Sequence, residues 1–170
     1  MATMDPMRLR DLSGDILGSI TMMLEASREK AALILIYAGI DIFGALDTDD
    51  GRATRNSFER WAETYLAPSK NLGCSGLELY SARCGLLHTM SAETDLTRDG
   101  RARQFVYITY PHFFPDQNVP GDTFVLHVGN FWQAFRAGTA QFLDDADKDP
   151  ARHARVTRNV GRLYFTQTTR

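Results

Sequence analysis

The sequence predicts a mainly α-helical protein, an antiparallel bundle with one small β-hairpin at about residues 103–128. Apolar residues recur at the three- and four-residue spacing of a helix face along most of the chain. Short polar connections separate these stretches, which favours antiparallel packing of neighbouring helices. A chain of 170 residues is long enough for a single core. We therefore expect one domain over residues 1–170, with residues 1–10 as a loose lead-in.

Two helices are predicted in the first third of the chain, at about 11–29 and 27–46, with a bend near Ser27. The second contains AALILIYAGIDIFGAL (31–46), which is apolar on nearly every side. This stretch is shorter than the roughly 20 residues that a membrane span needs, and Asp41 interrupts it. A buried core helix is therefore expected, and no membrane partner.

Two further helices are predicted before the β-hairpin. The first covers about 55–66 and ends before Pro68, because proline cannot continue a helix. The second covers 75–89. There Ser75 and Glu78 form a Ser-x-x-Glu capping box just ahead of an apolar run.

The β-hairpin comes from two β-branched and aromatic stretches, 103–110 and 123–128, separated by a turn region that contains three prolines. We expect the strands to pair antiparallel and to pack on the helices, since a lone hairpin is marginal in water. Two helices follow, at about 130–146 and 151–164. The region from 90 to 103 is polar and is predicted to be a surface loop.

Composition narrows the class of protein. The net charge of −2 argues against a chain that mainly coats nucleic acid, although a local basic patch is compatible with it. Cys74 and Cys84 are too few for a disulfide scaffold and are expected to be reduced thiols. No CxxC or HxxxH spacing occurs, so no metal site and no cofactor are expected. The first residues lack the apolar region of a signal peptide, which predicts a cytoplasmic protein.

Arg83 and His88 are the residues that suggest chemistry, because a core helix needs neither. Histidine exchanges protons near neutral pH, and arginine offers a fixed charge and a planar set of donors to phosphate. On an ideal helix, residues five apart lie about 140° apart. The pair therefore meets only if the helix is distorted near Gly85, if the length of the arginine closes the gap, or across a dimer axis. Asp41 is the expected third member, either pairing with Arg83 or orienting His88. Tyr80 is placed to stack under Arg83, with core packing as the alternative.

SARCGLLHT resembles the Arg-x(4–6)-His motif of the all-α HEPN superfamily, with Arg83 and His88 at the marker positions. The chain is also similar to bacterial proteins of unassigned function in which ARCGLLHT is followed by a stretch like that from Ser91 to Arg103. The HEPN resemblance implies a metal-independent RNase of the toxin or defence type. It also implies an RNA substrate, a homodimer in which two motifs face one cleft, and an antitoxin-like protein partner.

One departure from the HEPN pattern keeps a second hypothesis open. Active members usually carry a polar residue after the arginine, whereas Cys84 stands there in this chain. The alternative is a non-catalytic helical interaction protein in which Arg83, Asp41 and His88 hold the core together.

Arginines at two places in the chain are candidates for binding the phosphate backbone. Four lie on one face of the last predicted helix, and three lie in the loop after the motif. The alternative for the helix is a solvated face opposite the acidic stretch 144–149. The candidates are Arg152, Arg155, Arg158, Arg162, Arg98, Arg101 and Arg103.

Overall fold

The computed structural model describes residues 9–67, 72–109 and 121–162, so most of the predicted lead-in lies outside it. The mainly α-helical prediction is confirmed. The elements in chain order are α1 (Leu9–Glu25), α2 (Glu29–Leu46), α3 (Arg55–Tyr65), α4 (Gly76–Cys84), the π-helical turn η1 (Gly85–Thr89), α5 (Asp95–Arg98), β1 (Gln104–Ile108), β2 (Thr123–His127), α6 (Val128–Lys148) and α7 (Pro150–Val160).

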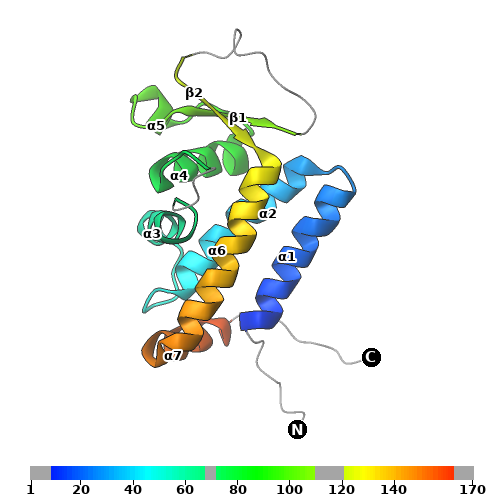
Figure 1. The fold of residues 1–170 in the computed structure, drawn as a ribbon. Helices are drawn as coiled ribbons and strands as arrows, with labels where there is room; N and C mark the ends of the chain where they lie inside the picture. The colour runs from blue at the N-terminus through cyan, green and yellow to red at the C-terminus, as the bar shows by residue number, and fades with distance from the viewer. Residues whose placement is uncertain (1–8, 68–71, 110–120, 163–170) are drawn as a thin grey trace.

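The helices form a bundle that is closed at one end by the two strands (Figure 1). α1 packs against α2 and α6, and α3 packs against α2, α4 and α6. In Figure 1, α1 runs antiparallel to α2, and the short turn between them carries Ser27 at φ 53°. The predicted bend near Ser27 is therefore confirmed. α4 lies beneath the sheet, whereas α7 lies at the opposite end of the bundle.

α2 is the buried core helix that its sequence predicts. Ile36, Tyr37, Ile40 and Phe43 have no exposed surface. The ring of Phe43 contacts aromatic rings of both α3 and α6, which ties three helices together. Among the described helices, none combines the length and the apolar character that crossing a membrane requires.

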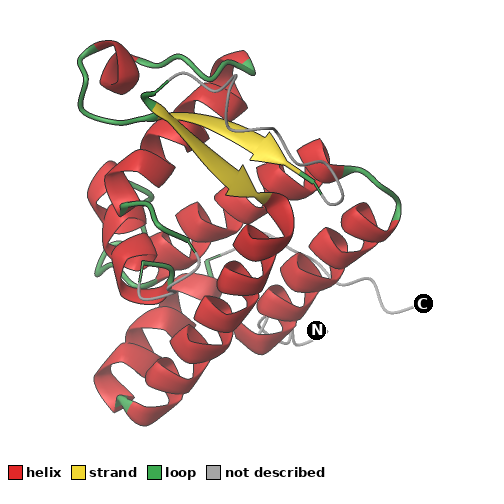
Figure 2. Ribbon diagram, turned by 45° about the horizontal axis from the view of Figure 1, so that its top comes forward, coloured by secondary structure: helices red, strands yellow, loops and turns green. Residues whose placement is uncertain are grey.

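The prediction of an antiparallel hairpin is wrong. β1 and β2 pair in parallel, with Gln104 opposite Thr123 and Ile108 opposite His127 (Figure 2). Strand propensity carries no information about direction. A parallel pair needs a crossover of a dozen or more residues, and the fourteen residues between the strands are enough for one. β2 also leads directly into α6, whose first turn is capped by His127 Nδ1 accepting from the N–H of Gly129.

Helix ends follow their capping residues. The predicted capping box is present, with Ser75 accepting from the N–H of Glu78 and the carboxylate of Glu78 accepting from the N–H of Ser75. A second box, between Thr94 and Thr97, starts the short helix α5 inside the stretch that is predicted to be a loop. The helix predicted over 75–89 is in fact two elements, because α4 gives way to η1 at Gly85.

Candidate functional site

Three predicted site residues lie together, although they come from three elements. Arg83 is on the last turn of α4, His88 on η1 and Asp41 on α2. Arg83 Nε lies 2.8 Å and Arg83 Nη2 lies 2.7 Å from the same oxygen, Asp41 Oδ2. Arg83 Nη1 lies 3.2 Å from His88 Nε2. The arginine therefore bridges a carboxylate and an imidazole.

The π-helical turn explains how residues five apart can meet. A π-helix closes its hydrogen bonds from i to i+5, so each turn takes up one more residue than an α-helical turn. The turn spans Gly85–Thr89 and is followed by Met90, which has a φ of 52°. Of the three sequence-based explanations, distortion near Gly85 is confirmed.

Gly85 is required by the close approach of another backbone segment. A Cβ built at this position would lie 2.2 Å from the carbonyl oxygen of Ser91. The N–H of Ser91 in turn donates to the carbonyl of Gly85 over 3.1 Å. The chain therefore folds back tightly on the π-turn, and a side chain at Gly85 would push the two segments apart.

Burial and charge distinguish the two ends of this cluster. The side chains of Arg83 and Asp41 are only 21% and 16% exposed, whereas His88 is exposed. Burial disfavours the charged guanidinium, but the hydrogen bond and the charge of Asp41 outweigh it and raise the pKa of Arg83. Arg83 therefore stays charged beside a solvent-facing imidazole.

The contact between Arg83 and His88 sets which imidazole nitrogen faces the guanidinium. A guanidinium can only donate hydrogen bonds, so Nε2 of His88 is the acceptor in this contact. The geometry therefore directs Nε2 of His88 at Arg83.

Tyr80 joins the cluster and brings in an arginine that sequence reasoning missed. The Cζ atom of Arg83 lies 6.0 Å from the centre of the Tyr80 ring, so the predicted proximity is confirmed. The Cζ atom of Arg55, from the first turn of α3, lies 5.7 Å from the same centre. The sequence offered one signal: Phe58 stands three residues after Arg55, one helical turn on. In the structure, Phe58 packs edge-on against Tyr80.

Cys84 also belongs to this cluster. Its side chain neighbours Arg83 and Tyr80 and contributes to the raised pKa of both groups. Burial, followed by the neighbouring Cys84, raises the pKa of Tyr80. Cys84 and Cys74 are both free thiols, as expected.

The arginines of α7, and Arg162 just after it, are held by the chain itself. Arg152 and Arg155 both bind the carboxylate of Asp47, with Arg152 Nε at 3.0 Å and Arg155 Nη2 at 2.8 Å. Arg158 and Arg162 donate to backbone carbonyls of residues 49 and 50. This face therefore covers the loop between α2 and α3. From the predicted acidic counterpart, the carboxylate of Asp145 lies 3.9 Å from Arg152 Nη1. A role of these residues in binding nucleic acid stays a prediction.

The three arginines after the motif differ in how firmly they are held. Arg103 donates to both carboxylate oxygens of Glu78 and to the carbonyl of Gly73. The hydrogen bond from Arg103 lowers the pKa of Glu78 to about 2. Arg98 pairs with Asp95 at the surface. Arg101 is exposed and forms no ion pair with any described residue.

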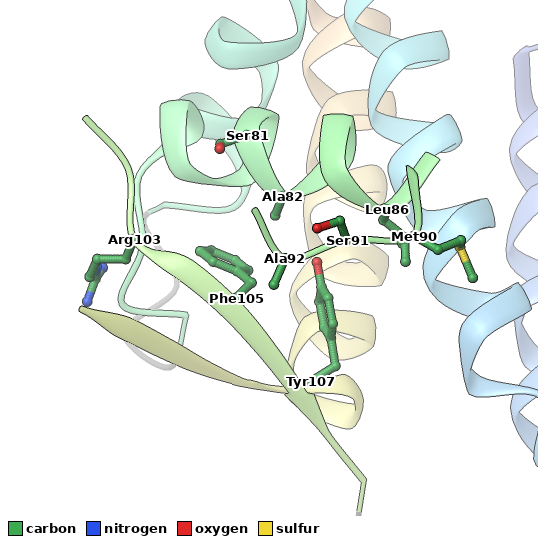
Figure 3. Close-up of a pocket in the computed structure, with 9 residues that line it drawn as sticks. All are labelled: Ser81, Ala82, Leu86, Met90, Ser91, Ala92, Arg103, Phe105 and Tyr107. Atoms are coloured by element: carbon green, nitrogen blue, oxygen red, sulfur yellow. The ribbon is translucent and has the colours of Figure 1, made fainter. Parts of the chain in front are cut away.

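A small cavity of about 210 Å³ lies between η1, with the segment after it, and β1 (Figure 3). Leu86 and Met90 line one side, and the rings of Phe105 and Tyr107 rise from β1 on the other. The hydroxyl of Tyr107 lies 2.7 Å from that of Tyr37 on α2. Asp41, Arg83 and His88 do not line this cavity, so it is separate from their cluster.

Within the described ranges, no group of three or more His, Cys, Asp or Glu side chains is arranged to hold a metal ion. No family model, curated protein or solved structure matches the chain.

Proposed function

We propose that this chain is a HEPN-like, metal-independent endoribonuclease in which Arg83 binds the scissile phosphate and His88 transfers the proton. The observation that supports this most directly is the 3.2 Å contact between Arg83 Nη1 and the acceptor nitrogen of an exposed His88. A phosphate clamp and a proton acceptor therefore stand side by side. In this proposal Asp41 positions Arg83 and does not touch the substrate.

The proposed reaction uses the 2′-hydroxyl of the RNA as nucleophile. Its oxygen forms a bond to phosphorus while the bond from phosphorus to the 5′-oxygen breaks. His88 Nε2 takes the proton of the 2′-hydroxyl, and Arg83 Nη1 turns to donate to a phosphoryl oxygen, where negative charge develops. The products are a 2′,3′-cyclic phosphate and a 5′-hydroxyl.

The leaving 5′-oxygen needs a proton, and the Asp41–Arg83–His88 cluster contains one histidine. We assign this proton to His88 of a second copy, which acts in its protonated form and donates a ring N–H to the 5′-oxygen. The active form in this proposal is therefore a homodimer with two motifs at one site. A cytoplasmic toxin or defence protein of this kind would be restrained by an antitoxin-like protein partner. Both partners belong to the proposal and are testable by size measurement and by co-purification.

The decisive experiment is cleavage of a mixed RNA substrate in EDTA by the wild type, Arg83→Ala and His88→Ala. His153→Ala is the matched control, since this exposed histidine lies on α7, at the far end of the bundle. Cleavage with cyclic-phosphate ends that both motif variants lose and the control retains is the expected result. A folded, dimeric wild type that leaves the RNA intact would contradict the proposal.

A second candidate function follows from the half-buried ion pair. Two donors of Arg83 on a single oxygen of Asp41 form the kind of contact that holds two packed helices together. In a non-catalytic interaction protein, Arg83→Ala and Asp41→Ala would lower the free energy of unfolding by about 1–3 kcal/mol. His88→Ala would change it little, and the wild type would show no cleavage.

A further inference from the structure

We infer that Arg55 extends the Arg83–His88 site into a second phosphate subsite, so that the site takes a single nucleic-acid strand across two phosphates. This inference rests on the proposed function and deepens it by naming the substrate class. It adds one binding residue, Arg55, and one positioning residue, Tyr80.

Two guanidinium groups from different helices converge on one aromatic ring. Arg55 comes from the first turn of α3 and Arg83 from the last turn of α4, and each Cζ atom lies within 6.0 Å of the centre of the Tyr80 ring. The ring is itself fixed by edge-on packing against Phe58. The spacing of the two cations is therefore set by the packing of α3 on α4.

The donors of the two arginines are not in competition. Arg83 uses Nε and Nη2 for Asp41 and turns Nη1 towards His88. Arg55 uses Nε for Glu59, one turn further along α3, which leaves its terminal nitrogens without a partner in the described structure. The side chain of Arg55 is 38% exposed, so a phosphate can reach it.

The other arginines give a useful contrast. Those of α7 bind Asp47 and the loop after it, and Arg103 binds Glu78. Arg55 thus combines access to solvent with a place at the same Tyr80 ring as the catalytic arginine. Two cations at one ring can bind two phosphates of one strand, whereas a ligand with a single phosphate would engage Arg83 alone.

The test measures binding, so it does not depend on cleavage. The probe is a fluorescein-labelled 2′-O-methyl RNA oligonucleotide, which lacks the attacking hydroxyl, titrated at several salt concentrations. The plot of log K against log [salt] has a negative slope. Each lost phosphate contact reduces the magnitude of this slope by about 0.7 for single strands. We expect Arg55→Gln and Arg83→Gln each to reduce the magnitude of the slope by about this amount.

Two further variants separate a binding role from a structural one. Glu59→Gln removes a carboxylate beside Arg55 and is expected to tighten binding, which no loss of structure would do. Arg52→Gln is the matched control, because Arg52 is 81% exposed and lies three residues before Arg55. Its slope is expected to equal that of the wild type. Melting curves by circular dichroism show whether each variant is folded.

The binding measurements distinguish failure of the Arg55 subsite from failure of the proposed function. If Arg83→Gln reduces the magnitude of the slope and folded Arg55→Gln does not, the subsite is wrong and the proposed function stands. Weaker binding by folded Glu59→Gln would also overturn the subsite. If the wild type does not bind the probe, or binds it with a slope that neither arginine affects, both the subsite and the proposed function are wrong.

Discussion

His88 lies 3.2 Å from Arg83 because the helix that carries both residues widens into a π-turn between them. In a straight α-helix the two side chains would diverge by about 140°. The contact that defines the site therefore depends on backbone geometry at Gly85, a residue with no chemistry of its own.

Gly85→Ala should disrupt this site. The added methyl group would meet the carbonyl oxygen of Ser91 at 2.2 Å, so either the π-turn or the segment after it must move. We expect the free energy of unfolding to fall by about 1–3 kcal/mol, measured by urea denaturation. Gly14→Ala is the control, because no atom lies within 4 Å of its Cβ position in α1. It should stabilise the protein by about 0.5–1 kcal/mol, and equal effects at the two glycines would contradict this account.

Asp47→Ala should destabilise the fold through α7. Arg152 and Arg155 are only 17% and 27% exposed, and both would lose their shared carboxylate. We expect a loss of about 1–3 kcal/mol, because truncating one member of a partly buried charge network leaves the others unpaired. Asp49→Ala is the control, since Asp49 is exposed and contributes its backbone carbonyl to Arg158. A loss as large at Asp49 would show that the loop backbone, and not the carboxylate, matters.

Ionised Glu78 should contribute to the free energy of unfolding, and this contribution should be lost at low pH. The hydrogen bond from Arg103 lowers the pKa of folded Glu78 to about 2, below its ordinary value of 4.5. The charged form is therefore favoured by folding, and this stabilisation is complete above about pH 4.5 and lost as the pH falls towards 2. Because the pair is partly exposed, it should contribute no more than about 1 kcal/mol.

Unfolding measured between pH 6 and about 2.5 checks this expectation. Glu78→Gln should flatten the fall in stability over that window. Asp95→Asn should not, since the Asp95 side chain is 91% exposed in its pair with Arg98. A Glu78→Gln curve parallel to that of the wild type would rule out the assigned role.

The hydroxyls of Tyr37 and Tyr107 should be energetically coupled. They lie 2.7 Å apart and connect buried α2 to β1, beside the cavity of Figure 3. Either single change to Phe leaves the other hydroxyl without its partner and should lower the free energy of unfolding by about 1–2 kcal/mol. The double variant should cost less than the two single changes together, because neither hydroxyl is then left without its partner. Strict additivity in the double-mutant cycle would show that the contact contributes nothing.

The sequence by itself determined the parts of the fold that depend on local pattern. The helical spacing of apolar residues predicted the helices, and Ser75 with Glu78 predicted the start of α4. The apolar surround of Asp41 predicted that its carboxylate needs a partner, and Arg83 provides it. These inferences hold because helix periodicity, capping and the cost of burying a charge act over a few residues.

Only the tertiary structure decided the rest. Strand propensity is the same in either direction, so the parallel pairing of β1 with β2 follows from how the strands dock on the bundle and lead into α6. The π-turn lies where Ser91 packs against Gly85, and Arg55 reaches Tyr80 because α3 packs on α4. Each of these features depends on contacts between segments that are separate in sequence, and no local pattern records such contacts.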